Sequence, residues 1–235
     1  TSNDDGGGQK TLQNHLNESL INWPEFWATD HKETDWLLEP LLAKGRAHAL
    51  YAEAKSGKSW ILLACVAALA TGRPILDRPA GDPINVLYVD FEMTPADLMD
   101  RLTEFGYTAD DDLTHLHYAL LPQLPALDTY DGGRTLLETA QSVGAEFVII
   151  DTFSRAVAGE ENSADTTRDF YRCTGLQLKK AGIGWLRTDH AGKDKERGQR
   201  GSSAKNDDVD IVLQLTKAET AEATARKIKT THRRM

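Results

Sequence analysis

The sequence predicts an α/β domain with a mostly parallel central sheet, flanked by helices and completed by antiparallel strands near its C-terminus. From residue 46 onward, short apolar runs of strand length alternate with longer segments of helical periodicity. This alternation is typical of parallel strands that are covered by helices on both faces. The chain has 235 residues, of which 40% are hydrophobic and 27% charged. It is therefore long enough to bury a core of that kind.

In the first half of this domain, turn residues and a helix cap delimit the elements. Gly72 and Pro74 end an apolar helix, and Pro122 ends the third strand. The second helix has Thr94 as N-cap and Pro95 at its first position, with an acidic residue three positions after the cap, Asp97. The predicted strands are residues 47–53, 85–91 and 113–121, and the predicted helices are 58–70 and 94–105.

In the second half, apolar content and periodicity support the prediction. The run 146–152 is the most apolar strand of the chain, and 163–181 has apolar positions at helical spacing. The last two strands are expected to pair antiparallel and to close the domain. No internal repeat is present, which favours one domain over residues 36–235. The predicted helices are 134–143 and 163–181, and the predicted strands are 146–152, 184–190, 209–215 and 225–231.

Residues 1–35 are predicted to be a flexible lead-in segment. The first ten residues are polar and contain three consecutive glycines, a composition typical of linkers. The chain stops at Met235 after an Arg-Arg pair without a capping element, so we expect a C-terminal truncation. Scattered aromatic side chains suit a lead-in that docks on its own domain or on a neighbouring subunit; they are Trp23, Phe26, Trp27 and Trp36.

Composition excludes several classes of protein. The formal net charge of −9 counts against a protein that coats duplex DNA with its whole surface. No segment has the apolar length of a membrane span, and the polar N-terminus is not a signal peptide, so we expect a cytoplasmic protein with no membrane partner. Cys65 and Cys173 are the only cysteines and lie far apart in the sequence, which argues against disulfides and a zinc site.

A phosphate-binding loop is predicted between the first strand and the first helix. Residues 52–59 match the Walker A pattern, except that Ala52 replaces its first glycine. In such a loop, backbone N–H groups hold the phosphates of ATP, Lys58 reaches the β- and γ-phosphates, and the Ser59 hydroxyl binds Mg²⁺. The expected nucleotide-binding residues are Ala52, Glu53, Ala54, Lys55, Ser56, Gly57, Lys58, Ser59 and Trp60.

Carboxylates at two further strand ends complete the expected site. Asp151 ends the most apolar strand, which is the Walker B pattern, and would hold Mg²⁺ through water together with Ser59. Hydrolysis also needs a group that positions or deprotonates water near the γ-phosphate. Glu92, just past the strand 85–91, is the main candidate for this role, and Asp90 is its rival.

Two segments resemble hexameric helicases with a RecA-like P-loop core. Residues 91–102, Phe-Glu-Met-Thr-Pro-Ala-Asp-Leu-Met-Asp-Arg-Leu, look like the corresponding segment of DnaB-type replicative helicases. The strand that ends in His190, the Ala-Gly-Lys run after it and Arg-Gly-Ser-Ser at 200–203 resemble RepA-like plasmid helicases. Related AAA-labelled ATPases of actinobacteria and phages share this arrangement. The resemblance covers about residues 36–235 and adds a RecA-like core to the expected fold.

The resemblance implies an ATP-hydrolysing motor that forms a hexameric ring on single-stranded DNA. Glu92 would activate the attacking water and His190 would sense the γ-phosphate. A basic residue would stabilise the transition state in a neighbour's site; the candidates are Arg200, Lys229, Arg233 and Arg234. The loop 155–162 suits DNA poorly because Glu160 and Glu161 would repel phosphate. The better DNA-contact candidates are Lys193, Lys195, Arg197 and Lys205.

Two other functions stay open at this point. The acidic balance and the absence of stacking aromatics in the basic loop also suit a KaiC-like RecA-fold ATPase that regulates protein partners. The alanine at position 52 would suit an ATP-binding scaffold with slow turnover. No Asn-Lys-x-Asp run is present, which favours ATP over GTP as the nucleotide.

Overall fold

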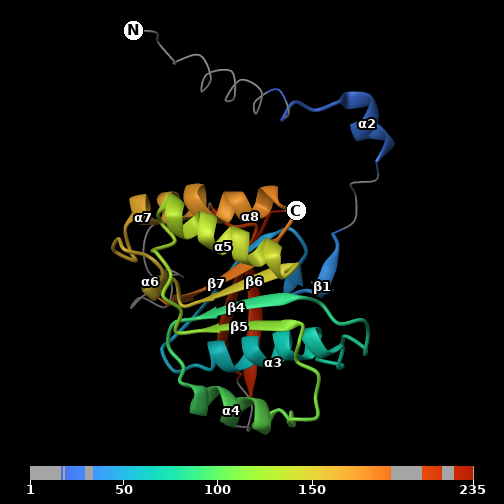
Figure 1. Ribbon diagram of the computed structural model, residues 1–235, viewed down its shortest axis with the longest axis vertical. Helices are drawn as coiled ribbons and strands as arrows, with labels where there is room; N and C mark the ends of the chain where they lie inside the picture. The colour runs from blue at the N-terminus through green and yellow to red at the C-terminus, as the bar shows by residue number, and fades with distance from the viewer. Residues whose placement is uncertain (1–16, 18, 30–33, 192–207, 219–224, 235) are drawn as a thin grey trace. The chain divides into compact units, whose positions relative to one another are not determined.

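The computed structural model describes residues 17, 19–29, 34–191, 208–218 and 225–234 (Figure 1). The chain divides into two compact units, Thr1–Thr34 and Asp35–Met235. In the first unit, α2 (Trp23–Ala28) has a proline in its first turn and no buried side chain, and Trp27 is 77% exposed. The sequence analysis noted these aromatics but predicted no helix there, because a six-residue helix is too short to show periodicity.

The second unit is built on one sheet whose described part has seven strands. Six of them run parallel, and the last strand pairs antiparallel with its neighbour, as the sequence predicted. A separate two-stranded hairpin precedes the sheet in the chain, formed by β1 (Trp36–Leu38) and β2 (Leu42–Ala43). In spatial order the strands of the sheet are β5 (Leu116–Leu120), β4 (Val86–Asp90), β6 (Phe147–Asp151), β7 (Gly184–His190), β3 (Ala47–Ala52), β8 (Ile211–Lys217) and β9 (Arg226–Arg233).

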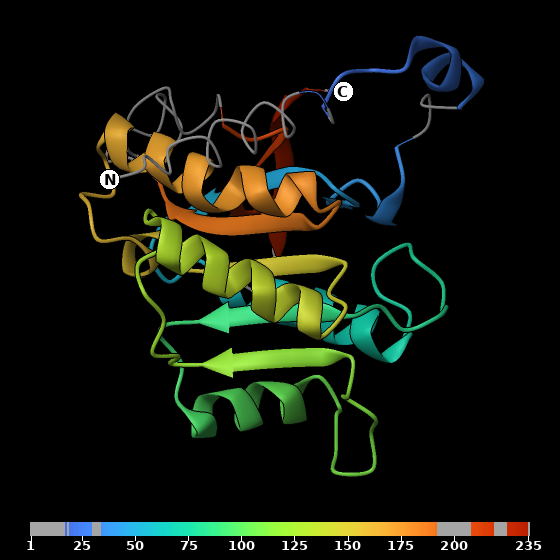
Figure 2. The same cartoon turned by 45° about the horizontal axis from the view of Figure 1, so that its top comes forward.

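Helices cover both faces of this sheet, which confirms the predicted fold class. In Figure 1, α3 (Lys58–Thr71) and α4 (Pro95–Glu104) lie below the strands, and α5 (Tyr130–Ser142) lies above them. Figure 2 shows that α7 (Ala164–Phe170) and α8 (Leu176–Lys180) share the α5 side. The short α6 (Phe153–Ala156) follows β6. No helix in the described ranges is long and apolar enough to cross a membrane.

The core has two layers because side chains alternate along each strand. In β4, Val86 and Tyr88 pack on the side of α3, whereas Leu87 and Val89 pack on the side of α5. The other parallel strands follow the same alternation, and every residue of β6 is buried. Burial on both faces explains why these strands read in the sequence as continuous apolar runs.

Two helices differ from their prediction where glycine packs closely against other parts of the chain. The helix predicted at 134–143 begins at Tyr130, because Gly132 and Gly133 belong to it. A Cβ on Gly132 would lie 2.1 Å from the Ala126 carbonyl oxygen. The helix predicted at 163–181 contains a π-helical segment, Tyr171–Gly175, between α7 and α8, where the Gly175 carbonyl accepts a hydrogen bond from the Trp185 indole. These glycines serve contacts with other parts of the chain, which periodicity does not show.

The parallel register brings four strand ends to one edge of the sheet. Asp90 of β4 pairs with Asp151 of β6, and Ala52 of β3 pairs with His190 of β7. Ligands of open α/β sheets bind outside the carboxyl ends of such strands. The fold therefore gathers the residues that the sequence analysis singled out from segments up to 138 positions apart.

The buried His48 makes stability depend on pH. Its ring lies between Trp185 O and Ala43 N, each 3.1 Å away, and burial lowers its pKa from 6.5 to about 4. The unfolded chain therefore binds a proton between these two values that the folded chain does not bind. We expect the contribution of neutral His48 to the free energy of unfolding to be fully present above pH 6.5. As the pH drops to 4, the free energy of unfolding should fall by about 3 kcal/mol through this group. Chemical denaturation across this range measures it.

His48→Gln removes the titrating group, so its unfolding free energy should change about 3 kcal/mol less over the same pH range. An unchanged slope in this variant would assign the acid sensitivity to other groups.

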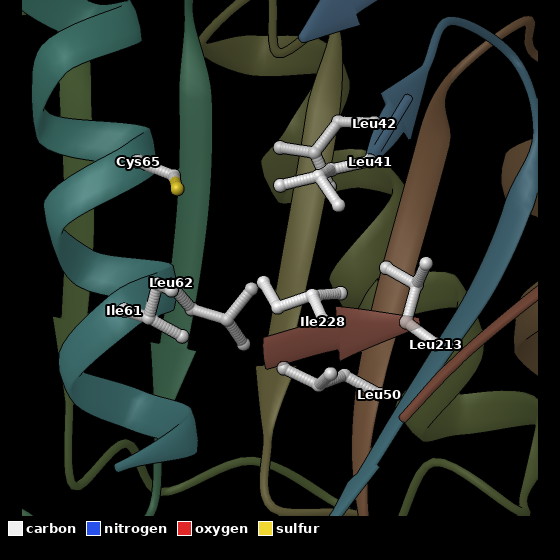
Figure 3. A pocket seen from close by; sticks show the side chains of 8 residues that line it. All are labelled: Leu41, Leu42, Leu50, Ile61, Leu62, Cys65, Leu213 and Ile228. Carbon is white, nitrogen blue, oxygen red and sulfur yellow. The ribbon is translucent and has the colours of Figure 1, made fainter. Parts of the chain in front are cut away.

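A small apolar cavity lies under α3, and Figure 3 shows its lining. Its volume is about 10 Å³, and all eight side chains around it lack strong hydrogen-bonding groups, so it is dry.

Leu62→Ala would enlarge this cavity, and we expect a loss of about 2–5 kcal/mol of unfolding free energy in denaturant titration. Cys65→Val, which adds volume toward the same space, should cost under about 1.5 kcal/mol. Equal losses in both variants would contradict this account.

Candidate active site

The loop between β3 and α3 has the backbone shape of an anion site. Gly57 is the N-cap of α3 with φ +94°, and Lys55 also has a positive φ of 58°. Such a sequence of conformations turns successive N–H groups inward, and the helix N-terminus adds its own free N–H groups. Gly57 is needed for its dihedral angle, because a Cβ there would meet no atom within 4 Å.

Ala52 lies at the end of the strand, outside the curved part of this loop. It is buried at the end of β3, packs in the α3-side core, and accepts a hydrogen bond at its carbonyl from Ala191 N. It is not among the residues with positive φ. The backbone here therefore does not need glycine, and this departure from the Walker A pattern leaves the loop shape intact.

The loop carries a buried cation. Lys58 is 9% exposed, and burial lowers the pKa of its ammonium group, while Asp151 and Glu92 oppose that change. The Ser56 carbonyl accepts a 3.0 Å hydrogen bond from Arg226 Nε of β9, so the far edge of the sheet also holds the loop. Sequence reasoning did not single out Arg226, because the contact spans 170 residues.

Asp90 and Asp151 are held by two stacked tyrosines. Tyr88 and Tyr118 stack with their ring centroids 4.8 Å apart. The Tyr88 hydroxyl donates to Asp151 Oδ2 over 2.8 Å, and the Tyr118 hydroxyl donates to Asp90 Oδ2. Thr188 of β7 donates to the other oxygen of Asp151 over 2.6 Å. Both carboxylates are thereby oriented from within the sheet.

Asp90 and Glu92 have different surroundings, which separates the two rivals for the catalytic role. Asp90 is 1% exposed, and its Oδ1 accepts hydrogen bonds from Glu92 N and Met93 N. It therefore shapes the turn that presents Glu92. The Glu92 side chain is 45% exposed, and its Oε1 lies 3.0 Å from Arg155 Nε. Of the two acids, Glu92 is the one accessible to a water molecule.

One cavity of about 370 Å³ is lined by the phosphate loop, Glu92 and Asp151 together. Ser59 and Asp151 line it together, and a hydroxyl with one carboxylate fits Mg²⁺, which keeps several waters and also binds phosphate oxygens. His190 lines the cavity from the end of β7, with its Nδ1 3.8 Å from Glu161 Oε1. The lining residues are Lys55, Ser56, Gly57, Lys58, Ser59, Trp60, Glu92, Arg101, Asp151, Thr152 and His190.

The structure brings most, but not all, of the predicted site residues to this cavity. Glu53 and Ala54 are exposed on the loop and do not line it. On β9, Lys229 pairs with Gln214 and Arg233 stacks over the Trp36 ring at 4.9 Å, and Arg234 directly follows that strand. None of these three described residues lines the cavity of its own chain. Five basic candidates lie outside the described residues: Lys193, Lys195, Arg197, Arg200 and Lys205.

The structure adds Arg101 and Thr152, to which the sequence analysis gave no role, although Arg101 belongs to the 91–102 segment of the resemblance. A signal for Arg101 was present in the sequence. It occupies the same helix face as Leu98, Leu102 and Phe105, which pack against the core. A charged residue at an apolar-face position indicates a site or a buried partner.

The fold and this cavity define an α/β P-loop NTPase core. The family described as AAA domain matches residues 18–196. This match covers more than half of the chain, and the chain belongs to that family. It is thus a P-loop protein of a nucleotide-hydrolysing type, in which Mg²⁺ typically accompanies the nucleotide. A comparison with curated proteins found no match.

The tyrosine pair provides a test of the metal site. Tyr88→Phe removes a donor to Asp151 and keeps the ring stack, so the carboxylate loses part of its orientation. We expect the Mg²⁺ concentration that half-saturates hydrolysis to rise about 10-fold. A Mg²⁺ titration of turnover measures it.

Tyr118→Phe is the matched control, because its hydroxyl contacts Asp90 and not Asp151. It should lower turnover without changing the Mg²⁺ midpoint. The same midpoint shift in both variants would mean that the tyrosines act through packing alone.

Proposed function

We propose that the protein is an ATP-hydrolysing motor of the RecA type, similar to RepA- and DnaB-like hexameric helicases, and that single-stranded DNA stimulates it. The observation that carries this proposal is the shared cavity of Lys58, Asp151 and Glu92. Asp151 ends β6, Glu92 follows the end of β4, and Lys58 opens the helix after β3. Together they supply the parts that phosphoryl transfer to water requires. His190, on a fourth strand, suits a sensor of the terminal phosphate.

Each side chain has a distinct task in the proposed reaction. The loop N–H groups and Lys58 bind the phosphates, and the buried ammonium group offsets their charge. Mg²⁺, when bound, neutralises charge on the β- and γ-phosphates, and Ser59 and Asp151 would hold it. Glu92 orients the attacking water and accepts its proton.

The Glu92–Arg155 ion pair connects the proposed catalytic glutamate to the segment 155–162. Arg155 belongs to α6, at the start of the 155–162 segment after β6. A ligand that moves this segment would change the partner of the catalytic glutamate. Both side chains are largely exposed, so the pair itself contributes little stability and can exchange readily.

Regulation of a protein partner is the second candidate. The net charge of −9 favours it, because an acidic surface attracts nucleic acid weakly. Salt-dependent binding of an oligonucleotide to the purified protein would decide against this candidate.

Glu92→Gln tests the catalytic assignment. The amide keeps the size of the side chain but cannot accept the proton, so we expect turnover to fall by about 10²–10⁴-fold while ATP still binds. Phosphate release and equilibrium binding of a fluorescent ATP analogue measure the two properties.

Glu138→Gln is the control, because Glu138 is an exposed glutamate on α5, on the other face of the sheet. Unchanged turnover in Glu92→Gln would sink the assignment and favour the slow ATP-binding scaffold.

The DNA and ring proposals have their own experiment. We expect single-stranded DNA to raise turnover and ATP to promote a hexamer in native mass measurement, with both effects absent in Lys58→Ala. Turnover that is the same with and without DNA at every protein concentration would contradict the motor and leave the protein-regulating ATPase.

A further inference from the structure

Arg101 brings a second cation into the phosphate cavity. It lies in the last turn of α4, and its side chain lines the cavity together with Lys58 and Glu92. Its Nη1 atom is buried and has no hydrogen-bond partner within the described residues. Buried guanidinium nitrogens are almost always paired, because leaving one without an acceptor is unfavourable. This arrangement therefore suggests an anionic ligand.

The acids around Arg101 already accept hydrogen bonds from other donors. Asp90 accepts from the Glu92 and Met93 amides and from the Tyr118 hydroxyl. Asp151 accepts from two hydroxyl groups, and Glu92 pairs with Arg155. Each of these carboxylates therefore has a hydrogen-bond donor other than Arg101, whose side chain lines the cavity.

Contacts between α3 and α4 place Arg101 beside the metal-binding end of the loop. The Trp60 indole donates to Glu104 over 2.9 Å, and the Trp60 and Phe105 rings meet edge-to-face at 4.9 Å. These contacts join the end of α4, one turn from Arg101, to the first turn of α3, where Ser59 lies. A nucleotide held by this loop would therefore have its terminal phosphate in the cavity that Arg101 and Glu92 line.

We propose that Arg101 contacts the terminal phosphate of bound ATP, as an arginine supplied by the same chain as the phosphate loop. The planar guanidinium group suits two parallel hydrogen bonds to phosphate oxygens. This inference rests on the proposed ATP hydrolysis and adds the group that distinguishes a triphosphate from a diphosphate. Arg101 then acts in cis, independently of any basic residue that a neighbouring chain contributes.

Arg101→Gln tests the contact, with Arg134→Gln as control. Arg134 is exposed on α5, on the opposite face of the sheet. Equilibrium binding of a non-hydrolysable ATP analogue and of ADP is measured separately for each variant. For Arg101→Gln we expect about 10- to 100-fold weaker binding of the triphosphate and ADP binding within about 2-fold of wild type. Arg101→Lys keeps the charge but not the planar guanidinium group, so its affinity for the triphosphate should lie between those of Arg101→Gln and wild type.

The outcomes separate this inference from the proposed function. If wild type binds and hydrolyses ATP but Arg101→Gln binds both nucleotides as wild type does, Arg101 has no phosphate contact and only this inference fails. Equal weakening for ATP and ADP in a variant with wild-type thermal stability also overturns it. If wild type binds no nucleotide, the proposed function fails first. Thermal unfolding of each unliganded variant shows whether the substitution has changed the fold.

Discussion

The parallel pairing of β4 with β6 is the constraint on which the candidate site depends. It sets Asp90 opposite Asp151 at the edge where both strands end. It also lets Tyr88 of β4 donate to Asp151, while the parallel pairing of β4 with β5 stacks Tyr118 on Tyr88 and lets Tyr118 donate to Asp90. A shift of one residue in this register would turn every side chain of one strand to the other face. The two-layer core, buried on both faces of the sheet, makes such a shift prohibitive.

Lys58, Asp90 and Asp151 are buried charged groups in and beside the cavity, and each has groups of opposite charge or hydrogen-bond donors beside it within the fold. Lys58 is buried near Asp151 and Glu92, and these carboxylates favour its charged form while burial opposes it. Asp90 and Asp151 are almost completely buried, yet each has hydroxyl or amide donors within the fold. Preorganised groups of this kind need little rearrangement when a phosphate binds, which is the condition for strong electrostatic stabilisation.

Contacts from distant segments connect the site to the rest of the domain. Arg226 holds the phosphate loop from β9, and Arg155 reaches Glu92 from α6. The buried Arg187 of β7 pairs with Asp189 and lies 4.8 Å from the centre of the Phe153 ring, in the same short helix as Arg155. The strand that ends in His190 and the helix that carries the partner of Glu92 are therefore packed together. A movement of this strand would therefore displace the helix, which is the coupling that the proposed motor requires.

The sequence by itself determined the order and type of the main elements and the phosphate loop. These features depend on local signals: apolar runs, the Thr94 cap, and glycine and lysine at fixed spacing before a helix. Asp151 was found for the same reason, because it ends an apolar strand. Glu92 and His190 were assigned their roles through the resemblance to DnaB- and RepA-like helicases. Local patterns extend over a few residues, so they could not show the glycines that pack inside α5 or the short α2.

Only the tertiary structure decided which of two neighbouring acids faces the cavity. The sequence favoured Glu92 and left Asp90 as its rival, and the hydrogen bonds of Asp90 to its own turn separate the two. It also decided that position 52 does not require glycine, that Arg101 lines the cavity and that Arg226 holds the loop. The places of Arg101 and Arg226 depend on elements that are far apart in the sequence, and sequence separation carries no information about such contacts until the strand order is known.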